Sequence, residues 1–251
     1  MVELYIVFLC SEMIRMMYCM NKLLIFLVSL FVFSSCASEY QIKGTSSISL
    51  LDGKMLFVKV LQGDEMVNVD SAEVVHGLFS MTGTVDSAVI ASLYMDDQSI
   101  MPFVVEKGNI RIVIDNTHMS VSGTPLNDRL YEFVGKKNSL DDRAYEIERM
   151  ESRMIMDGKS SDEIEQEMTR ERENLAEEMN ALAKDFIQSN YENVLGPGVF
   201  MMLCNSFPYP ILTPLIEEIV DEAPASFQND PMIKEYMDAA KANMETMKAN
   251  N

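Results

Sequence analysis

Histidine and cysteine are scarce in this chain of 251 residues, with two and four residues respectively, and tryptophan is absent. Histidine and cysteine are the side chains that most often supply metal ligands, acid–base groups near neutral pH and thiol nucleophiles. The sequence also lacks a Cys-x-x-Cys pair, a Gly-rich phosphate-binding loop and a Ser-His-Asp order. We therefore expect a protein that is not an enzyme, with no catalytic residue, no cofactor and no metal site.

Basic residues are outnumbered, since 20 Lys and Arg face 39 Asp and Glu for a formal charge of −19. Such an acidic chain repels phosphate backbones at long range, so we exclude nucleic acid as a partner. Apolar residues make up 48% of the chain, which is enough to bury a sizeable core. The length fits one large or two small folded domains.

A hydrophobic run covers residues 23–33 and contains Ser29 as its only polar residue. Lys22 precedes the run, and two serines lead from it into Cys36. A basic residue, a short apolar stretch and small residues in this order are typical of a secretory signal, and the stretch is too short to span a bilayer comfortably. We therefore expect residues 1–35 to be a signal region that is removed.

The residues that end at Cys36 resemble the lipobox of bacterial lipoproteins, with Phe33 where that family usually has Leu. The resemblance implies that the Cys36 thiol is acylated and becomes the first residue of the mature chain; a plain signal peptide and an uncleaved anchor are the alternatives. Residues 1–19 are superfluous before a complete signal, so Met20 is the expected start. Ala37, the residue after the lipidated cysteine, implies by analogy with other Gram-negative lipoproteins that the protein is sorted to the outer membrane. The prediction is an outer-membrane lipoprotein of the cell envelope, held by its lipid anchor on the periplasmic or the surface face.

Residues 36–123 are expected to form a β-sandwich domain. Short apolar runs with period two follow one another from about residue 40 to residue 122, separated by Gly, Asp, Asn and Ser. Seven or eight strands at this spacing predict an antiparallel sandwich or open barrel. The clearest runs are Lys54–Val60, Gly77–Gly83, Ala88–Tyr94, Ile100–Glu106 and Asn109–Asp115.

Residues 124–251 are expected to be helical, which makes the fold class α+β. Apolar residues at helical spacing predict a long charged helical hairpin of about 30 residues per arm. The break falls at 157–159, and Ser160 with Glu163 forms a capping box that opens the second arm. The apolar seam is only one or two residues wide, so it needs the other arm, the sheet or a second molecule as its partner.

Shorter helices are expected after the hairpin, because Gly196-Pro197-Gly198 and five further prolines interrupt the sequence. We predict a buried helical turn over 199–204, an amphipathic helix over 212–220 and a last helix from Pro231 to about Met247.

The β region carries a series of motifs that resembles a known family. They are Asp70-Ser71, Gly77-x-Phe79-x-Met81-x-Gly83, Phe103-x-x-Glu106-x-Gly108-x-Ile110-x-Ile112 and Gly123-x-x-Leu126-Asn127, and Asp185–Asn190 matches a later segment. This series looks like the domain of unknown function, and the helical region after it, in thioredoxin-like lipoproteins of anaerobic Gram-negative bacteria. The resemblance implies the accessory region of those proteins without their catalytic Cys-x-x-Cys domain.

The remaining chemistry-bearing residues each have a structural explanation. Cys204 is flanked by apolar residues, which predicts a buried thiol of raised pKa, and an inert core cysteine is favoured over a redox thiol. His76 lies in an expected turn, and His118 lies near Asp115 at the last strand, without converging metal ligands. The acidic pairs, Asp96-Asp97 in a loop and Asp141-Asp142 at a helix start, fit solvated turn and cap chemistry.

Five aromatic residues are candidates for the lining of a binding groove, although such residues belong to the core in most proteins. They are Tyr40, Tyr94, Tyr131, Tyr209 and Phe207.

Three functions are compatible with this pattern. The first is a non-catalytic envelope lipoprotein that acts as a binding or scaffolding module for an envelope protein or for its own second copy. The alternative is a component of periplasmic thiol-disulfide exchange, which works with a separate thioredoxin-like partner or through Cys204. The third is a surface-exposed binder of glycans or peptides, which rests on fold alone.

Overall fold

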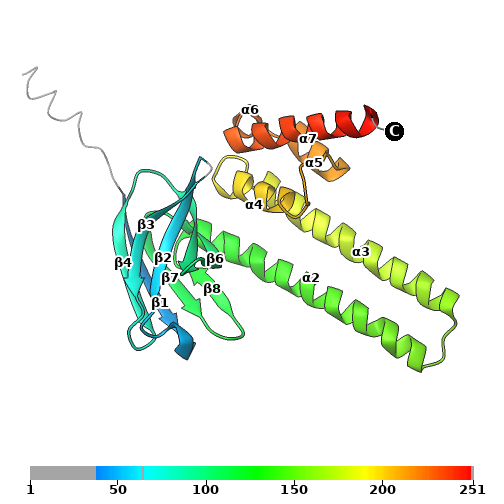
Figure 1. The fold of residues 1–251 in the computed structure, drawn as a ribbon, viewed down its shortest axis with the longest axis horizontal. Helices are drawn as coiled ribbons and strands as arrows, with labels where there is room; N and C mark the ends of the chain where they lie inside the picture. The colour runs from blue at the N-terminus through cyan, green and yellow to red at the C-terminus, as the bar shows by residue number, and fades with distance from the viewer. Residues whose placement is uncertain (1–37, 64, 250–251) are drawn as a thin grey trace, which may run out of the picture. The chain divides into compact units, whose positions relative to one another are not determined.

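The structure, a computed structural model, describes residues 38–63 and 65–249. Eight strands are followed by two long helices and four shorter ones in this part of the chain (Figure 1), which confirms the predicted α+β class. The signal region 1–35, Met20 and the lipidation site Cys36 lie outside the described residues. Among the described helices, none combines the length and the apolar character needed to cross a membrane.

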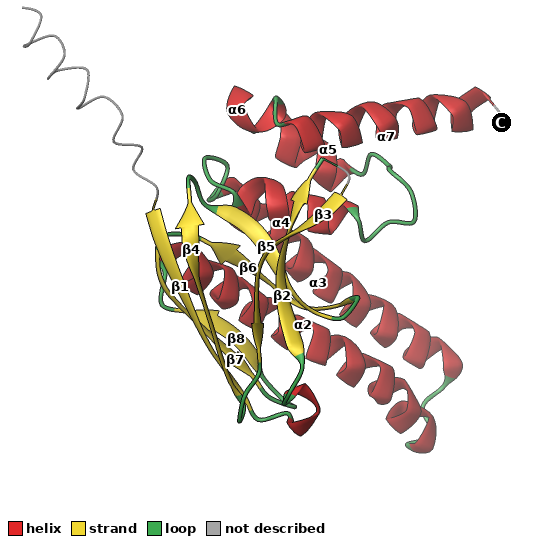
Figure 2. Ribbon diagram, turned by 60° about the vertical axis from the view of Figure 1, so that its left-hand side comes forward, coloured by secondary structure: helices red, strands yellow, loops and turns green. Residues whose placement is uncertain are grey.

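The strands form two four-stranded sheets that pack face to face as a sandwich (Figure 2). The eight described strands are β1 (Ser38–Ser46), β2 (Met55–Gln62), β3 (Glu65–Glu73), β4 (Leu78–Val85), β5 (Val89–Met95), β6 (Gln98–Val105), β7 (Gly108–Ile114) and β8 (Met119–Ser122). A 3-10 turn, η2 (Ser49–Leu51), follows β1. The strand orders are β4-β1-β7-β8 and β3-β2-β5-β6. One pair, β1 with β7, is parallel, so the expectation of purely antiparallel sheets is wrong there. The two strands are far apart in sequence, and no hairpin turn constrains their direction.

Alternation along the strands explains the core of the sandwich. Ile42 in β1 and Ile110, Ile112 and Ile114 in β7 point inward from one sheet, and Leu93 does so from the other. Successive side chains of a strand face opposite sides, so every second residue enters the core and the period-two pattern follows.

A close approach across the first sheet depends on one glycine. The Phe79 ring lies over Gly44, where a Cβ atom would be 1.9 Å from the ring. Only a residue without a side chain leaves room for the ring at this point.

The predicted helical hairpin is present as α2 (Pro125–Met156) and α3 (Ser161–Gln188). The Ser160 hydroxyl accepts from the Glu163 amide and the Glu163 carboxylate accepts from the Ser160 amide, which confirms the capping box. The other arm is the partner of the narrow seam, where buried Ile147, Met168 and Leu175 meet.

The acidic pair Asp141-Asp142 lies in the interior of α2, so its placement at a helix start is wrong. The helix passes through this position without a break and is 32 residues long. The Lys137 Nζ atom lies 2.6 Å from the Asp141 carboxylate one turn away, a spacing that supports a continuous helix.

Four shorter helices build a second core after the hairpin: α4 (Leu195–Cys204), α5 (Pro214–Asp221), α6 (Ala225–Gln228) and α7 (Pro231–Ala249). Helix α4 begins at Leu195 and includes Gly196-Pro197-Gly198, which were expected to interrupt helices. Pro197 is tolerated because the amides of a first turn have no partner within the helix. The amphipathic helix expected from residue 212 begins at Pro214, where Thr213 accepts from the Ile216 amide.

A buried asparagine joins the hairpin to the sandwich. Asn127 Oδ1 accepts from the Val104 amide at 2.8 Å, and Asn127 Nδ2 donates to the Val104 carbonyl at 2.7 Å and to Thr124 Oγ1 at 2.8 Å. Glu106 accepts from the Leu126 and Asn127 amides at the start of α2. β6 is an edge strand, and the Asn127 side chain satisfies the backbone amide and carbonyl of Val104 there, as a neighbouring strand would.

Candidate binding groove

A groove of about 490 Å³ lies between the sandwich and the C-terminal helices. We call it the junction groove. The sheet side is formed by Leu61, Val89 and Ile90, and the helical side by Val194, Pro197, Gly198, Met201, Phe227 and Met232, with Tyr191, Glu192, Asn193, Ser226 and Asp230 completing the lining. Most of this surface is apolar, as is usual for binding sites.

The base of the groove is set by a close contact between α4 and β5. A Cβ atom on Gly198 would lie 1.8 Å from Ile90 Cδ1. Glycine at this position leaves room for the tip of the Ile90 side chain against the helix backbone, so α4 packs closely on this residue of β5 at the base of the groove.

An aromatic pair forms one wall. The rings of Tyr191 and Phe227 pack edge to face with centroids 4.7 Å apart, and Phe200 packs on Phe227 at 5.6 Å from behind. The Tyr191 hydroxyl donates to the Ile219 carbonyl at 2.6 Å, and burial raises the pKa of this phenol. Packing and the hydrogen bond together fix the ring before any ligand arrives.

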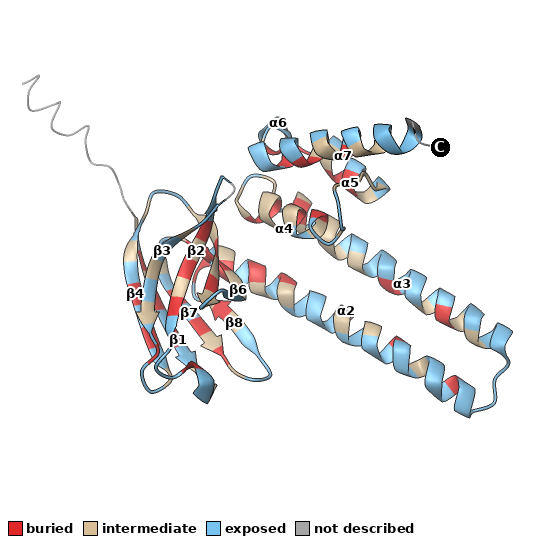
Figure 3. Cartoon of the chain, in the orientation of Figure 1, coloured by how far each residue is buried: buried red, intermediate tan, exposed pale blue. Residues whose placement is uncertain are grey.

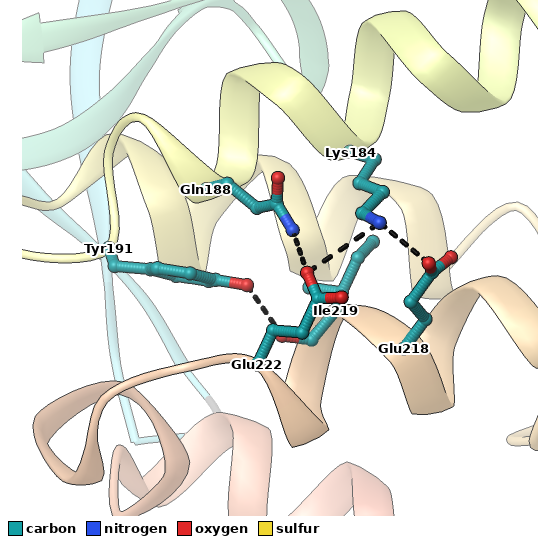
Figure 4. Close-up of polar contacts among 6 residues, drawn as sticks. All are labelled: Lys184, Gln188, Tyr191, Glu218, Ile219 and Glu222. Carbon is teal, nitrogen blue, oxygen red and sulfur yellow. Dashed lines mark hydrogen bonds and ion pairs between the residues drawn. The ribbon is translucent and has the colours of Figure 1, made fainter.

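Polar contacts between α3 and α5 support this wall from outside (Figure 4). The Lys184 ammonium lies 2.6 Å from the Glu218 carboxylate and 3.6 Å from that of Glu222, and Gln188 donates to Glu222. The hydrogen bond to Glu218 is the main cause that raises the pKa of Lys184. These contacts link α3 with the C-terminal end of α5, and α5 supplies the Ile219 carbonyl that accepts from the Tyr191 hydroxyl.

Both charged residues of the lining are acidic. Glu192 is exposed and accepts weakly from the Ser226 hydroxyl at 3.4 Å. Asp230 caps α7, where its carboxylate accepts from the Met232 amide at 3.0 Å. Within the described lining neither Lys nor Arg occurs, so the rim carries negative charge above an apolar base.

Cys204 lies at the end of α4 and outside the groove lining. Its side chain is buried in the helical core as a free thiol. Burial raises the pKa of the Cys204 thiol to about 12, and a contact with the Tyr236 hydroxyl lowers it by a smaller amount. The predicted burial and raised pKa are confirmed, and a thiol in this state is a poor nucleophile near neutral pH.

The other predicted polar residues remain separate from each other. His76 occupies the turn before β4 with a φ of 52°, and the His118 amide donates to Asp115 in the turn between β7 and β8. Asp96-Asp97 forms the turn between β5 and β6. In the part of the chain that the structure describes, no three His, Cys, Asp or Glu side chains gather as metal ligands do.

The five aromatic residues singled out from sequence do not line the junction groove. Tyr40 is buried and donates to Asp70 at 2.9 Å, and burial raises its pKa to about 12. Tyr131 donates to the Pro102 carbonyl, and Tyr94 packs under the Lys59 ammonium. Tyr209 is exposed on a loop and Phe207 packs at the edge of the helical core.

The true lining residues were missed because they come from four distant segments. Three segments contribute four residues or fewer, the segment 191–201 contributes seven, and none of the four carries a functional motif. The Gly-Pro-Gly sequence at the start of α4 is the one local signal near the groove, since it marks a close backbone approach.

Comparison with known proteins identifies part of the chain. Residues 40–130 match a family described as a domain of unknown function (DUF4369). The match covers the sandwich and the first residues of α2, including Asn127, and it leaves out the helical side of the groove. No curated protein matches the chain.

Proposed function

We propose that this protein is a non-catalytic lipoprotein of the cell envelope that binds a partner protein in the junction groove. The observation that carries the proposal is the groove itself, an apolar surface between two regions with a closely packed base and an aromatic wall held by ring packing and a hydrogen bond. Preformed apolar grooves with few polar groups are suited to binding. The signal and lipobox pattern that ends at Cys36 supports attachment to the outer membrane.

A relation to thioredoxin-like lipoproteins belongs to the same proposal. In this view the sandwich and the helices correspond to the accessory region of those proteins, which holds a partner rather than performing chemistry. The match of residues 40–130 to a domain of unknown function supports the sandwich part of this relation. The helical part rests on the resemblance of Asp185–Asn190 and the proline-rich helices after it.

The alternative role in thiol-disulfide exchange differs in what it requires of Cys204 or of a separate partner. Attack on a disulfide needs a thiolate with access to solvent. Cys204 is buried and its pKa is raised to about 12, so the observations favour the binding role.

Site-specific photo-crosslinking in intact cells of the native host tests the proposal. A photoreactive residue replaces Met232 at the groove end of α7 in the full-length lipoprotein, and Met247 at the other end of the same helix serves as the control. The two methionines are similarly exposed, at 39% and 42%. We expect a discrete protein adduct from position 232 and none from position 247. Equal adducts from both positions contradict binding in the groove.

The same experiment in a Cys204→Ser background separates the two roles. The binding role predicts the same adduct at position 232, because the thiol lies outside the lining. Loss of the adduct only in the Cys204→Ser protein contradicts the non-catalytic role and supports mixed-disulfide chemistry.

A further inference from the structure

The shape of the junction groove limits what it can bind. Leu61 and Met232 line it and are 50% and 39% exposed, so the groove opens to solvent along its rim. A small molecule is usually enclosed over most of its surface, whereas an open groove with apolar anchors is typical of peptide recognition.

Hydrogen bonding restricts the conformation of such a peptide. Leu61 belongs to β2, which is paired with β3 on one side and β5 on the other. Val89 and Ile90 belong to β5, which is paired with β2 and β6. The pairing of β2 with β5 ends at Val60 and Ala91, so only the last two residues of β2 and the first two of β5 lie beyond it at the groove. Such short strand ends offer an extended peptide few hydrogen bonds, whereas a helix satisfies its own backbone groups.

Charge restricts the sequence of that helix. Glu192 and Asp230 stand at the rim, and the described lining holds no Lys or Arg to neutralise them. The whole chain carries a formal charge of −19, which favours a basic partner at long range as well. The two flexible methionines, Met201 and Met232, let the apolar base adapt to the side chains of the helix.

We infer that the junction groove binds an amphipathic helix of a partner protein, with an apolar face toward Ile90 and Met201 and Lys or Arg side chains beside Glu192 and Asp230. This inference rests on the proposed function and adds the chemical class of the ligand. The groove volume of about 490 Å³ holds the few anchoring side chains of such a helix.

Two synthetic helical peptides serve as probes. Each has about 18 residues and the same Leu and Ala face, and the flanking positions carry Lys in one peptide and Glu in the other. Binding to the full-length lipoprotein in zwitterionic nanodiscs is measured by fluorescence anisotropy, with empty nanodiscs as the blank. We expect the Lys peptide to bind about tenfold more tightly than the Glu peptide, and added salt to reduce the difference.

Charge variants test the role of the rim. Glu192→Gln with Asp230→Asn removes two charges and keeps the oxygen atoms that accept from Ser226 and from the start of α7. This variant is expected to lose most of the preference for the Lys peptide. Glu165→Gln with Glu173→Gln, exposed on the distal half of α3, removes the same charge and is expected to keep the preference.

Apolar variants test the groove itself. Leu61→Gln with Met232→Gln is expected to weaken binding of the Lys peptide at least tenfold. Met55→Gln with Met247→Gln changes residues on the same strand and the same helix, 41% and 42% exposed, and is expected to bind as the unaltered protein does.

The outcomes separate the inference from the proposed function. Equal binding of both peptides, lost in the Leu61/Met232 variant, overturns the basic-helix inference and leaves groove binding standing. Failure of both peptides to bind also overturns the inference. Self-association of the protein that the Leu61/Met232 variant abolishes assigns the groove to a second copy and overturns it as well. Lys-peptide binding that is unaffected by the Leu61/Met232 variant contradicts the groove as the site, and with it the proposed function.

Discussion

The sandwich and the distal half of the helical hairpin differ in how much apolar surface they bury. The sandwich encloses apolar side chains from two sheets, and its central residues are fully buried. The distal hairpin buries a single seam around Ile147, Met168 and Leu175, and most of its surface is exposed (Figure 3). Burial of apolar area is the main stabilising term in folding, so the sandwich holds far more stabilisation per residue.

Ion pairs do not compensate the distal hairpin for its smaller buried apolar surface. The hairpin carries exposed ion pairs, among them Arg143 with Glu178 between the arms and Arg153 with Glu146 within α2. Exposed pairs contribute little because water and salt screen them and because two long side chains must be ordered. The comparison indicates that the distal hairpin opens locally while the sandwich stays folded.

The largest expected effect is the loss of a buried ring in the sandwich. Phe103→Ala removes a fully buried side chain, and we expect it to lower the free energy of unfolding by about 3–5 kcal/mol. Urea denaturation followed by circular dichroism measures the change. Ile155→Ala, at an exposed apolar position of α2, is the control and is expected to stay within about 0.5 kcal/mol. A loss below about 1 kcal/mol for Phe103→Ala contradicts the assigned importance of the sandwich core.

The next effect concerns the link between the two regions. Asn127→Ala leaves the Val104 amide and carbonyl without their partner, and we expect a loss of about 3 kcal/mol. Asn138→Ala on the exposed face of the same helix is the matched control. Hydrogen exchange measured by mass spectrometry reports both the edge of β6 and the start of α2. Unchanged protection at Val104 in the Asn127→Ala protein argues against this link.

A smaller and local effect is expected in the seam. Leu175→Ala truncates a buried leucine between two helices that are free to close over the gap, so we expect about 2 kcal/mol, near the low end for such changes. Exchange of amides in the distal hairpin should accelerate while that of β7 stays unchanged. Met156→Ala, at the exposed last residue of α2, serves as the control. Equal acceleration in β7 contradicts the local opening of the hairpin.

Local patterns predicted most elements of both regions. Period-two alternation located five of the eight described strands, namely β2, β4, β5, β6 and β7, because each has one face in the core. The seam and its capping signal located both arms of the hairpin. The parallel pairing of β1 with β7 was not predictable, since it depends on which distant strands meet and no turn residue records that choice.

The groove was not predictable for the same reason. Leu61, Ile90 and Met201 are ordinary apolar residues of a strand or helix, and only tertiary packing turns them toward one opening. Tyr191 was overlooked, whereas Tyr40 and Tyr131 were considered. Tyr40 proved to be buried and Tyr131 partly buried, and the hydroxyl of each has a hydrogen-bond partner within the protein. Sequence patterns report which side chains are buried, but a site between two regions appears only after the regions are assembled.

The smallest effect concerns the start of α3, where sequence and structure agree most closely. Ser160→Ala removes the hydroxyl that accepts from the Glu163 amide, and we expect a loss of about 1 kcal/mol confined to the first turns of the helix. Ser161→Ala, at the next residue, leaves the cap intact and should be neutral. Hydrogen exchange of the amides after residue 161 distinguishes the two. A faster exchange at the tip without a change in the midpoint of urea unfolding would show that the distal hairpin opens independently of the sandwich, because a cap in a fully cooperative fold would shift that midpoint.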